Sequence, residues 1–137
     1  MNDTTRTALE FYRMQRGVEP DRNWKAMLIL VTASKSLWEK VEPHLDYRHG
    51  NAWLNKVQKQ EYLSGGEAAL LSLSRNLYNG DTLVDLAGLA DTLDDDLWPA
   101  VLEALAVYRG QGGRLAMIDG HTASWPWCRL ALSWMTC

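Results

Sequence analysis

The sequence has little cysteine, and that limits what can hold the fold together. Only Cys128 and Cys137 occur in 137 residues, and both lie close to the C-terminal end. A disulfide between two residues so close in sequence would not join distant parts of the fold. We therefore expect two free thiols in a reducing compartment, the cytoplasm.

Long apolar runs are also missing. The longest one covers residues 26–31, far fewer than the roughly 20 residues a membrane-spanning helix needs. The first residues, MNDTTR, lack the basic stretch and apolar core of a secretion signal. We expect a protein without a membrane partner.

The rest of the composition is that of an ordinary globular protein. Hydrophobic residues make up 47% and charged residues 23%. A chain of this length can bury a core without disulfides or metals. The composition therefore predicts a folded protein, and the helix signals described next place a helical domain at residues 1–109.

Helix signals recur along residues 1–109. Gly17 followed by Pro20, and later Gly80, have the order typical of helix C-terminal ends. Residues 26–32 could also form a buried strand, although a helix is favoured. The pattern predicts an all-α compact bundle of about six helices. The expected helix-capping residues are Asp3 or Thr4, Asp21, Ser36 with Glu39, Asn51, Ser64 with Glu67, and Thr82 with Asp85.

The pattern changes after residue 109. A glycine-rich joint at residues 110–113 precedes an atypical Trp-rich C-terminal segment, which extends to residue 137 and holds three of the seven tryptophans. These are Trp125, Trp127 and Trp134. They either complete the core or present an aromatic patch to a partner or to a second copy of the chain, since tryptophan is enriched at binding hot spots.

Negative charge is concentrated in one segment. Residues 81–109 carry seven acids and one base, a net charge of −6, whereas residues 1–80 carry +2. Such a segment disfavours nucleic-acid phosphates and suits a basic partner surface or solvent. Asp91, Asp94, Asp95 and Asp96 could imitate a phosphate backbone; the alternative is that they cap a helix and are solvated.

Motifs for catalysis are absent or incomplete. LSGGE at residues 63–67 is similar to the signature loop of ABC-type ATPases, but the phosphate-binding loop with its lysine is missing. A helix cap explains Ser64 and Glu67 more simply. Cys128 has no feature of an activated thiol. We therefore predict no catalytic residues and a non-enzymatic protein.

Metal and cofactor sites are not expected either. His44, Asp46 and His49, even with Asp119 and His121, match no recognised ligand spacing. A turn with solvated polar groups explains the first three.

Two pairs of predicted helices could contact nucleic acid as a helix-turn-helix motif does. The pair 65–79 and 83–93 has no lysine or arginine in its second helix, so it cannot contact phosphates well. The pair 21–33 and 35–42 carries four cations. The basic region 13–40 is therefore the alternative site, for a small nucleic-acid-binding or regulatory subunit. Its four cations are Arg22, Lys25, Lys35 and Lys40.

Several segments together resemble a family of small, uncharacterised helical proteins found in bacterial phages and integrative elements. The resemblance covers roughly residues 8–109. The resemblance implies a mobile-element protein in a bacterial cytoplasm. It assigns no functional role to any residue of this sequence. The segments are VEPDRNWKA (18–26), LW (37–38), PH (43–44), SGGEAALL (64–71), NLYNG (76–80), DDD (94–96) and VLEAL (101–105).

These observations favour a protein-binding module of a phage or mobile element. In this hypothesis it inhibits a bacterial defence or nucleic-acid-processing complex, as anti-CRISPR proteins do. Its partner would be a host or element protein, and nucleic acid is not expected as a direct partner. The four aspartates would meet the partner's basic surface, and the three C-terminal tryptophans would serve as apolar anchors.

Overall fold

The computed structural model describes residues 1–110, and these residues are mostly helical. The predicted all-α class is confirmed at this level, with seven α-helices in the described part where about six were expected. Residues 111–137, with Trp125, Trp127 and Trp134, lie outside it. In order, the elements are α1 (Asp3–Arg16), α2 (Arg22–Val31), α3 (Lys35–Val41), the 3-10 helix η1 (Glu42–His44), β1 (Leu45–Asp46), β2 (Asn51–Ala52), α4 (Leu54–Gln60), α5 (Gly65–Asn79), α6 (Leu86–Thr92) and α7 (Trp98–Arg109).

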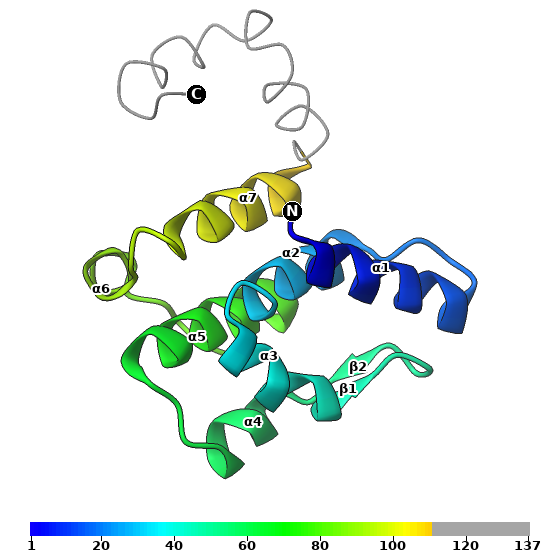
Figure 1. Ribbon diagram of the computed structural model, residues 1–137, viewed down its shortest axis with the longest axis horizontal. Helices are drawn as coiled ribbons and strands as arrows, with labels where there is room; N and C mark the ends of the chain where they lie inside the picture. Colours follow the sequence, from blue (N-terminus) through cyan, green and yellow to red (C-terminus); the bar gives the residue numbers. More distant parts are fainter. Residues whose placement is uncertain (111–137) are drawn as a thin grey trace, which may run out of the picture.

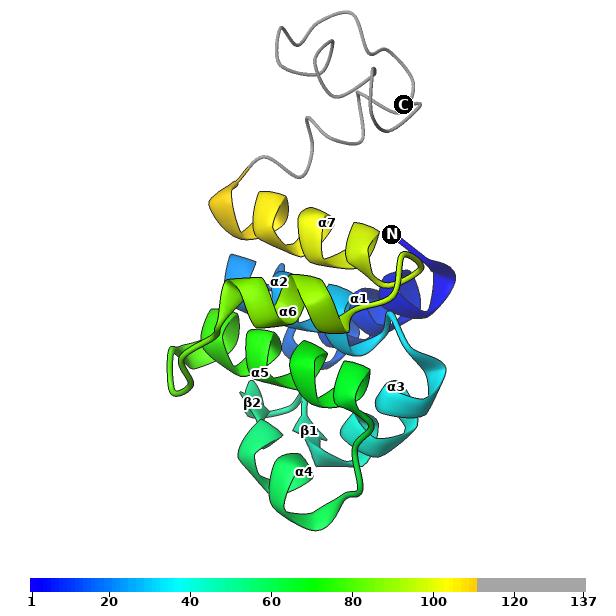
Figure 2. The same cartoon turned by 90° about the vertical axis from the view of Figure 1, so that its left-hand side faces the viewer.

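Helix α2 is the centre of the molecule. It lies between α7 on one side and α5 on the other, with α1 beside it (Figures 1 and 2). Every residue from Ala26 to Val31 is at most 3% exposed. A helix that is apolar nearly all round is stable only when neighbours cover it on several sides. The helical interpretation of this segment is confirmed, and the strand alternative is wrong.

Two of the predicted caps form as expected. The Asp21 side chain accepts a hydrogen bond from the Trp24 amide at 2.9 Å, and the Ser64 hydroxyl accepts one from the Glu67 amide at 3.2 Å. Each satisfies an amide that has no partner within its own helix. Gly17 and Gly80 end α1 and α5 in the left-handed conformation, with φ of 69° and 72°.

The predicted cap of the first helix is wrong. Asn2, rather than Asp3 or Thr4, begins α1 by accepting a hydrogen bond from the Thr5 amide at 2.7 Å. Its side-chain amide also donates to the Thr32 carbonyl at 3.1 Å, at the end of α2. The Thr5 and Thr32 hydroxyls lie 2.5 Å apart in the interior. A tertiary hydrogen-bond network therefore selects the cap.

Three other helix starts also differ from the sequence prediction. Ser34, not Ser36, caps α3 by accepting from the Leu37 amide at 3.3 Å. Asn51 lies in β2 and caps nothing, and α6 begins only after Asp85, whose side chain makes no capping hydrogen bond. Capping residues are favoured at turns as well as at helix starts, so their spacing alone did not identify the starts.

The turn expected around His44, Asp46 and His49 is part of a β-hairpin, in which Leu45 pairs with Ala52 and Asp46 with Asn51 in antiparallel register. The Ala52 amide donates to the Tyr78 hydroxyl of α5 at 3.0 Å. These contacts hold the hairpin against the helices. Within residues 1–110, no helix combines the length and apolar character needed to cross a bilayer.

Candidate functional site

The four aspartates predicted to meet a partner are all exposed in the structure. Asp91 lies in the last turn of α6, and Asp94, Asp95 and Asp96 form the connection to α7. Figures 1 and 2 show this connection at an end of the helical body, where α6 passes up to α7. We call these four residues the acidic face.

The acidic face does not cap α7. The N-cap of α7 is Leu97, and no side chain forms a capping hydrogen bond there. Instead, the Asp94 carbonyl accepts from the Leu97 and Trp98 amides at 3.0 and 3.1 Å. In residues 1–110 none of the four carboxylates has a hydrogen-bond or ion-pair partner. The capping part of the alternative interpretation is therefore wrong, whereas its other part, solvation of these carboxylates, agrees with their exposure. Negative charge near a helix N-terminus remains favourable.

Exposed leucines accompany these carboxylates in the sequence. Leu83 is 93% exposed and Leu86 is 61% exposed, and Leu102 and Leu105 on α7 are also exposed. Single exposed leucines are common on protein surfaces, whereas protein interfaces combine apolar contacts with a polar rim. The segment 81–109 offers both kinds of group to a partner.

The cations of the basic region are largely engaged within the molecule. Arg13 donates to both oxygens of Glu19, at 2.7 and 2.8 Å, and Lys25 lies 3.4 Å from the same carboxylate. The hydrogen bonds from Arg13, together with Lys25, lower the pKa of Glu19 to about 2. Glu19 therefore stays ionised and screens both cations.

Further along this region, Lys40 lies 2.7 Å from a carboxylate oxygen of Glu67 and also donates to the Tyr62 carbonyl. The Arg22 guanidinium stacks over the Tyr108 ring, 4.5 Å from its centroid. Of the four cations expected to face nucleic acid, Lys35 alone has no such engagement within residues 1–110.

One of the two histidines near the turn, His49, forms a local contact. The His49 ring nitrogen Nδ1 lies 2.8 Å from Asp46, and the His49 amide donates to the same carboxylate at 3.1 Å. The hydrogen bond from His49 lowers the pKa of Asp46. Among residues 1–110, no three histidine, cysteine or acidic side chains gather as a metal site would require.

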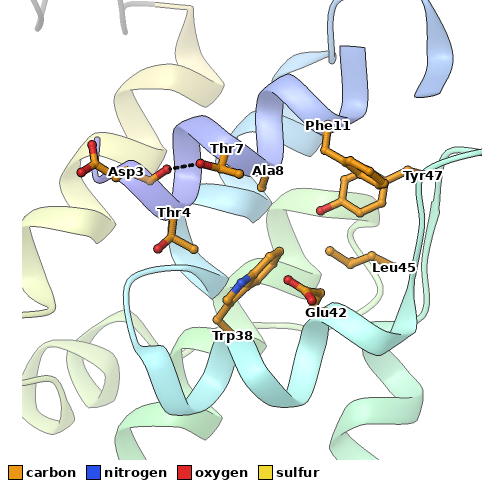
Figure 3. Close-up of a pocket in the computed structure, with 9 residues that line it drawn as sticks. All are labelled: Asp3, Thr4, Thr7, Ala8, Phe11, Trp38, Glu42, Leu45 and Tyr47. Atoms are coloured by element: carbon orange, nitrogen blue, oxygen red, sulfur yellow. Dashed lines mark hydrogen bonds between the residues drawn. The ribbon is translucent and has the colours of Figure 1, made fainter. Parts of the chain in front are cut away.

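The structure also contains a pocket that the sequence did not predict. It lies between α1 on one side and α3, η1 and β1 on the other, and has a volume of about 600 Å³ (Figure 3). We call it the aromatic groove. The spacing of its aromatic residues in the sequence does not show that they share an opening. The lining residues are Asp3, Thr4, Thr7, Ala8, Phe11, Trp38, Glu42, Leu45 and Tyr47.

Comparison with known proteins gives no relative to transfer a function from. No protein-family model, no curated protein and no solved structure matches this chain. The resemblance to mobile-element proteins therefore stays a prediction.

Proposed function

We propose that this chain is a non-enzymatic protein-binding module whose acidic face contacts a basic surface on a protein partner. One observation carries the proposal: four exposed carboxylates lie close together in sequence, with no side-chain cation bound to them in the described part of the chain. By contrast, the carboxylates of Glu19 and Glu67 are paired with cations of the same chain, whereas these four are left to solvent or to a partner.

The charge distribution supports the same function. A net charge of −6 over residues 81–109 produces a local negative field that attracts a basic surface and raises the rate of encounter. Leu83 and Leu86 would add apolar contact once the partner is bound. Charge would then set orientation and rate, and the leucines would contribute to affinity.

The biological setting is part of the proposal. The resemblance to phage and integrative-element proteins motivates an inhibitor of a bacterial defence or nucleic-acid-processing complex. Such complexes bind nucleic acid through basic surfaces. A row of carboxylates that imitates phosphates would occupy such a surface and block it. The C-terminal tryptophans would then act as apolar anchors.

A charge-neutralised variant tests the proposal. We expect the triple variant Asp94→Asn, Asp95→Asn, Asp96→Asn to lose specific partners in quantitative affinity purification from a bacterial lysate. The changes keep side-chain shape and break no side-chain hydrogen bond or ion pair within residues 1–110. The matched control is Glu10→Gln, Glu39→Gln, Glu61→Gln, which removes three exposed charges from other parts of the chain; of these, Glu10 also forms an exposed ion pair with Arg13 at 3.7 Å.

If the control variant retains partners that the aspartate variant loses, the result supports binding through the acidic face. Equal recovery by both variants and the unaltered chain contradicts it. The salt dependence gives a second measure: because exposed charges are screened, capture should weaken as the ionic strength rises.

The nucleic-acid alternative has a separate test. Because Arg13, Lys25 and Lys40 are already paired, we expect no mobility shift of duplex DNA or RNA at low salt. A shift that weakens steeply with added salt, and that Lys35→Gln or Arg22→Gln reduces, would favour the basic region instead.

A further inference from the structure

The aromatic groove has walls made by side chains from three separate elements. Phe11 comes from α1, Trp38 from α3, and Tyr47 from the turn that follows β1. The Phe11 and Tyr47 rings meet edge to face, with centroids 4.8 Å apart and an angle of 84° between their planes. Figure 3 shows the Trp38 ring rising from α3 toward α1, so the rings border one space.

A carboxylate lies at the same opening. Glu42, in η1, projects beside the Trp38 ring in Figure 3. Within residues 1–110 it has no hydrogen-bond or ion-pair partner. Burial and the negative charge of Glu42 raise the pKa of Tyr47 to about 12. The field of Glu42 therefore reaches into the groove.

The nine lining residues contain no lysine, arginine or histidine to neutralise this charge. Asp3 is a second carboxylate at the rim, but it lies 2.9 Å from Arg6 and is almost fully exposed. The Thr7 hydroxyl donates a hydrogen bond to the Asp3 carbonyl at 2.9 Å. Glu42 is thus the lining carboxylate left for a ligand.

We propose that the aromatic groove binds a small organic cation that carries a fully alkyl-substituted, quaternary ammonium group. Aromatic faces attract such cations through their quadrupoles, and a nearby carboxylate adds direct attraction. The volume of about 600 Å³ falls in the range of small-molecule pockets and exceeds what one ammonium group fills. Ala8 and Leu45 would contact the apolar part of the ligand.

The lining favours this ligand over other cations. Calcium and magnesium need several oxygen ligands, and the groove offers one carboxylate without a partner. A guanidinium or primary ammonium needs acceptors for its N–H groups, whereas a fully substituted ammonium has none to satisfy. The groove shares no residue with the acidic face, so this proposal stands apart from the function proposed above.

Choline chloride is the probe, titrated into the ¹⁵N-labelled full chain and followed by NMR. We expect saturable shifts of the Trp38 indole N–H and of the Thr4 and Thr7 amides. The neutral compound 3,3-dimethylbutan-1-ol has the same shape without the charge. It should bind about three- to thirtyfold more weakly, because cation–π attraction is lost.

Variants localise the site. Glu42→Gln and Phe11→Leu should each weaken choline binding about three- to tenfold. Both residues are exposed, so the fold should persist, which the spectrum itself checks. The matched controls are Glu39→Gln on α3 and Trp53→Leu, which is 43% exposed like Phe11 but lies outside the groove. They should leave the affinity within about twofold.

Three results overturn the proposal. One is equal binding of choline and its neutral counterpart. Another is an equal loss of choline affinity in the Glu42→Gln and Glu39→Gln variants. The third is saturation by N-acetyl-lysine methylamide but not by choline, which would indicate that a peptide side chain is the occupant.

Discussion

Lys40 and Glu67 form a partly buried ion pair that joins α3 to α5. Their side chains are 23% and 12% exposed, and the nitrogen and oxygen lie 2.7 Å apart. Burial alone would raise the pKa of Glu67, but hydrogen bonds from Lys40 and Ser64 outweigh it, so the pKa is lowered. Lys40, which was expected in a nucleic-acid surface, and Glu67, which was expected in a helix cap, therefore contribute to stability together.

Replacing Lys40 by methionine should lower the free energy of unfolding by about 1 kcal/mol at neutral pH, because Glu67 is left without its ammonium partner. The lowered pKa sets the pH dependence. The pair stabilises the fold above the ordinary value of 4.5, and this contribution is lost as the pH falls through the folded pKa.

Urea unfolding followed by circular dichroism, at neutral pH and at about pH 3, measures the effect. The gap between Lys40→Met and the unaltered chain should close in acid. Lys35→Met, an exposed change on the same helix, should stay within about 0.5 kcal/mol at both pH values. A gap that persists in acid would mean that lost packing or the lost hydrogen bond to the Tyr62 carbonyl, rather than the ion pair, is responsible.

At the scale of elements, helix ends determine how α5 and its neighbours connect. Ser64 begins α5, and Gly80 ends it with φ of 72°, where its amide donates to the Arg75 and Asn76 carbonyls at 3.2 and 3.0 Å. The chain then reverses toward α6 and the acidic face. The left-handed conformation is the reason for a glycine here, since a Cβ added at Gly80 meets nothing within 4 Å.

The change Gly80→Ala should destabilise the protein by about 1–2 kcal/mol, because the left-handed conformation is costly for a residue with a Cβ. Gly66→Ala is the matched control in the first turn of the same helix, where the added Cβ would make ordinary contact with Leu97 at 3.8 Å. It should be neutral or stabilise by about 0.4–1 kcal/mol. Thermal unfolding of both variants measures the difference. Equal losses of stability would show that the room for a Cβ atom, not the backbone conformation, determines the effect.

At the scale of the whole molecule, α2 holds the helices together. It separates α5 from α7, so its side chains contact neighbours on opposite sides (Figures 1 and 2). Leu28 and Leu30 are fully buried. Among the elements that carry or adjoin the acidic face and the aromatic groove, α7, α1 and α3 pack directly on this helix.

Leu28→Ala should therefore cost about 2–5 kcal/mol, the usual range for a buried leucine that leaves a cavity. Leu83→Ala, at a side chain that is 93% exposed, should change the free energy of unfolding by less than about 0.5 kcal/mol. Chemical denaturation of the two variants provides the comparison. A small effect at Leu28 would contradict the central position of α2.

Residue patterns in the sequence determined the helical class, the buried character of residues 26–31, the left-handed glycines and the concentration of negative charge. Each depends on neighbours within a few positions along the chain, which is why periodicity and capping rules detect it. Exposure of the acidic face follows from the same local information, because adjacent aspartates are rarely buried.

Only the tertiary structure decided which cap residues act, which charges are paired and where the aromatic groove lies. Asn2 caps α1 in part through Thr32, and Lys40 meets Glu67 across two helices. The groove joins Phe11 to Trp38 and Tyr47, which lie about 30 positions further along the chain. Contacts between residues so far apart depend on how helices pack, and a linear pattern does not encode that.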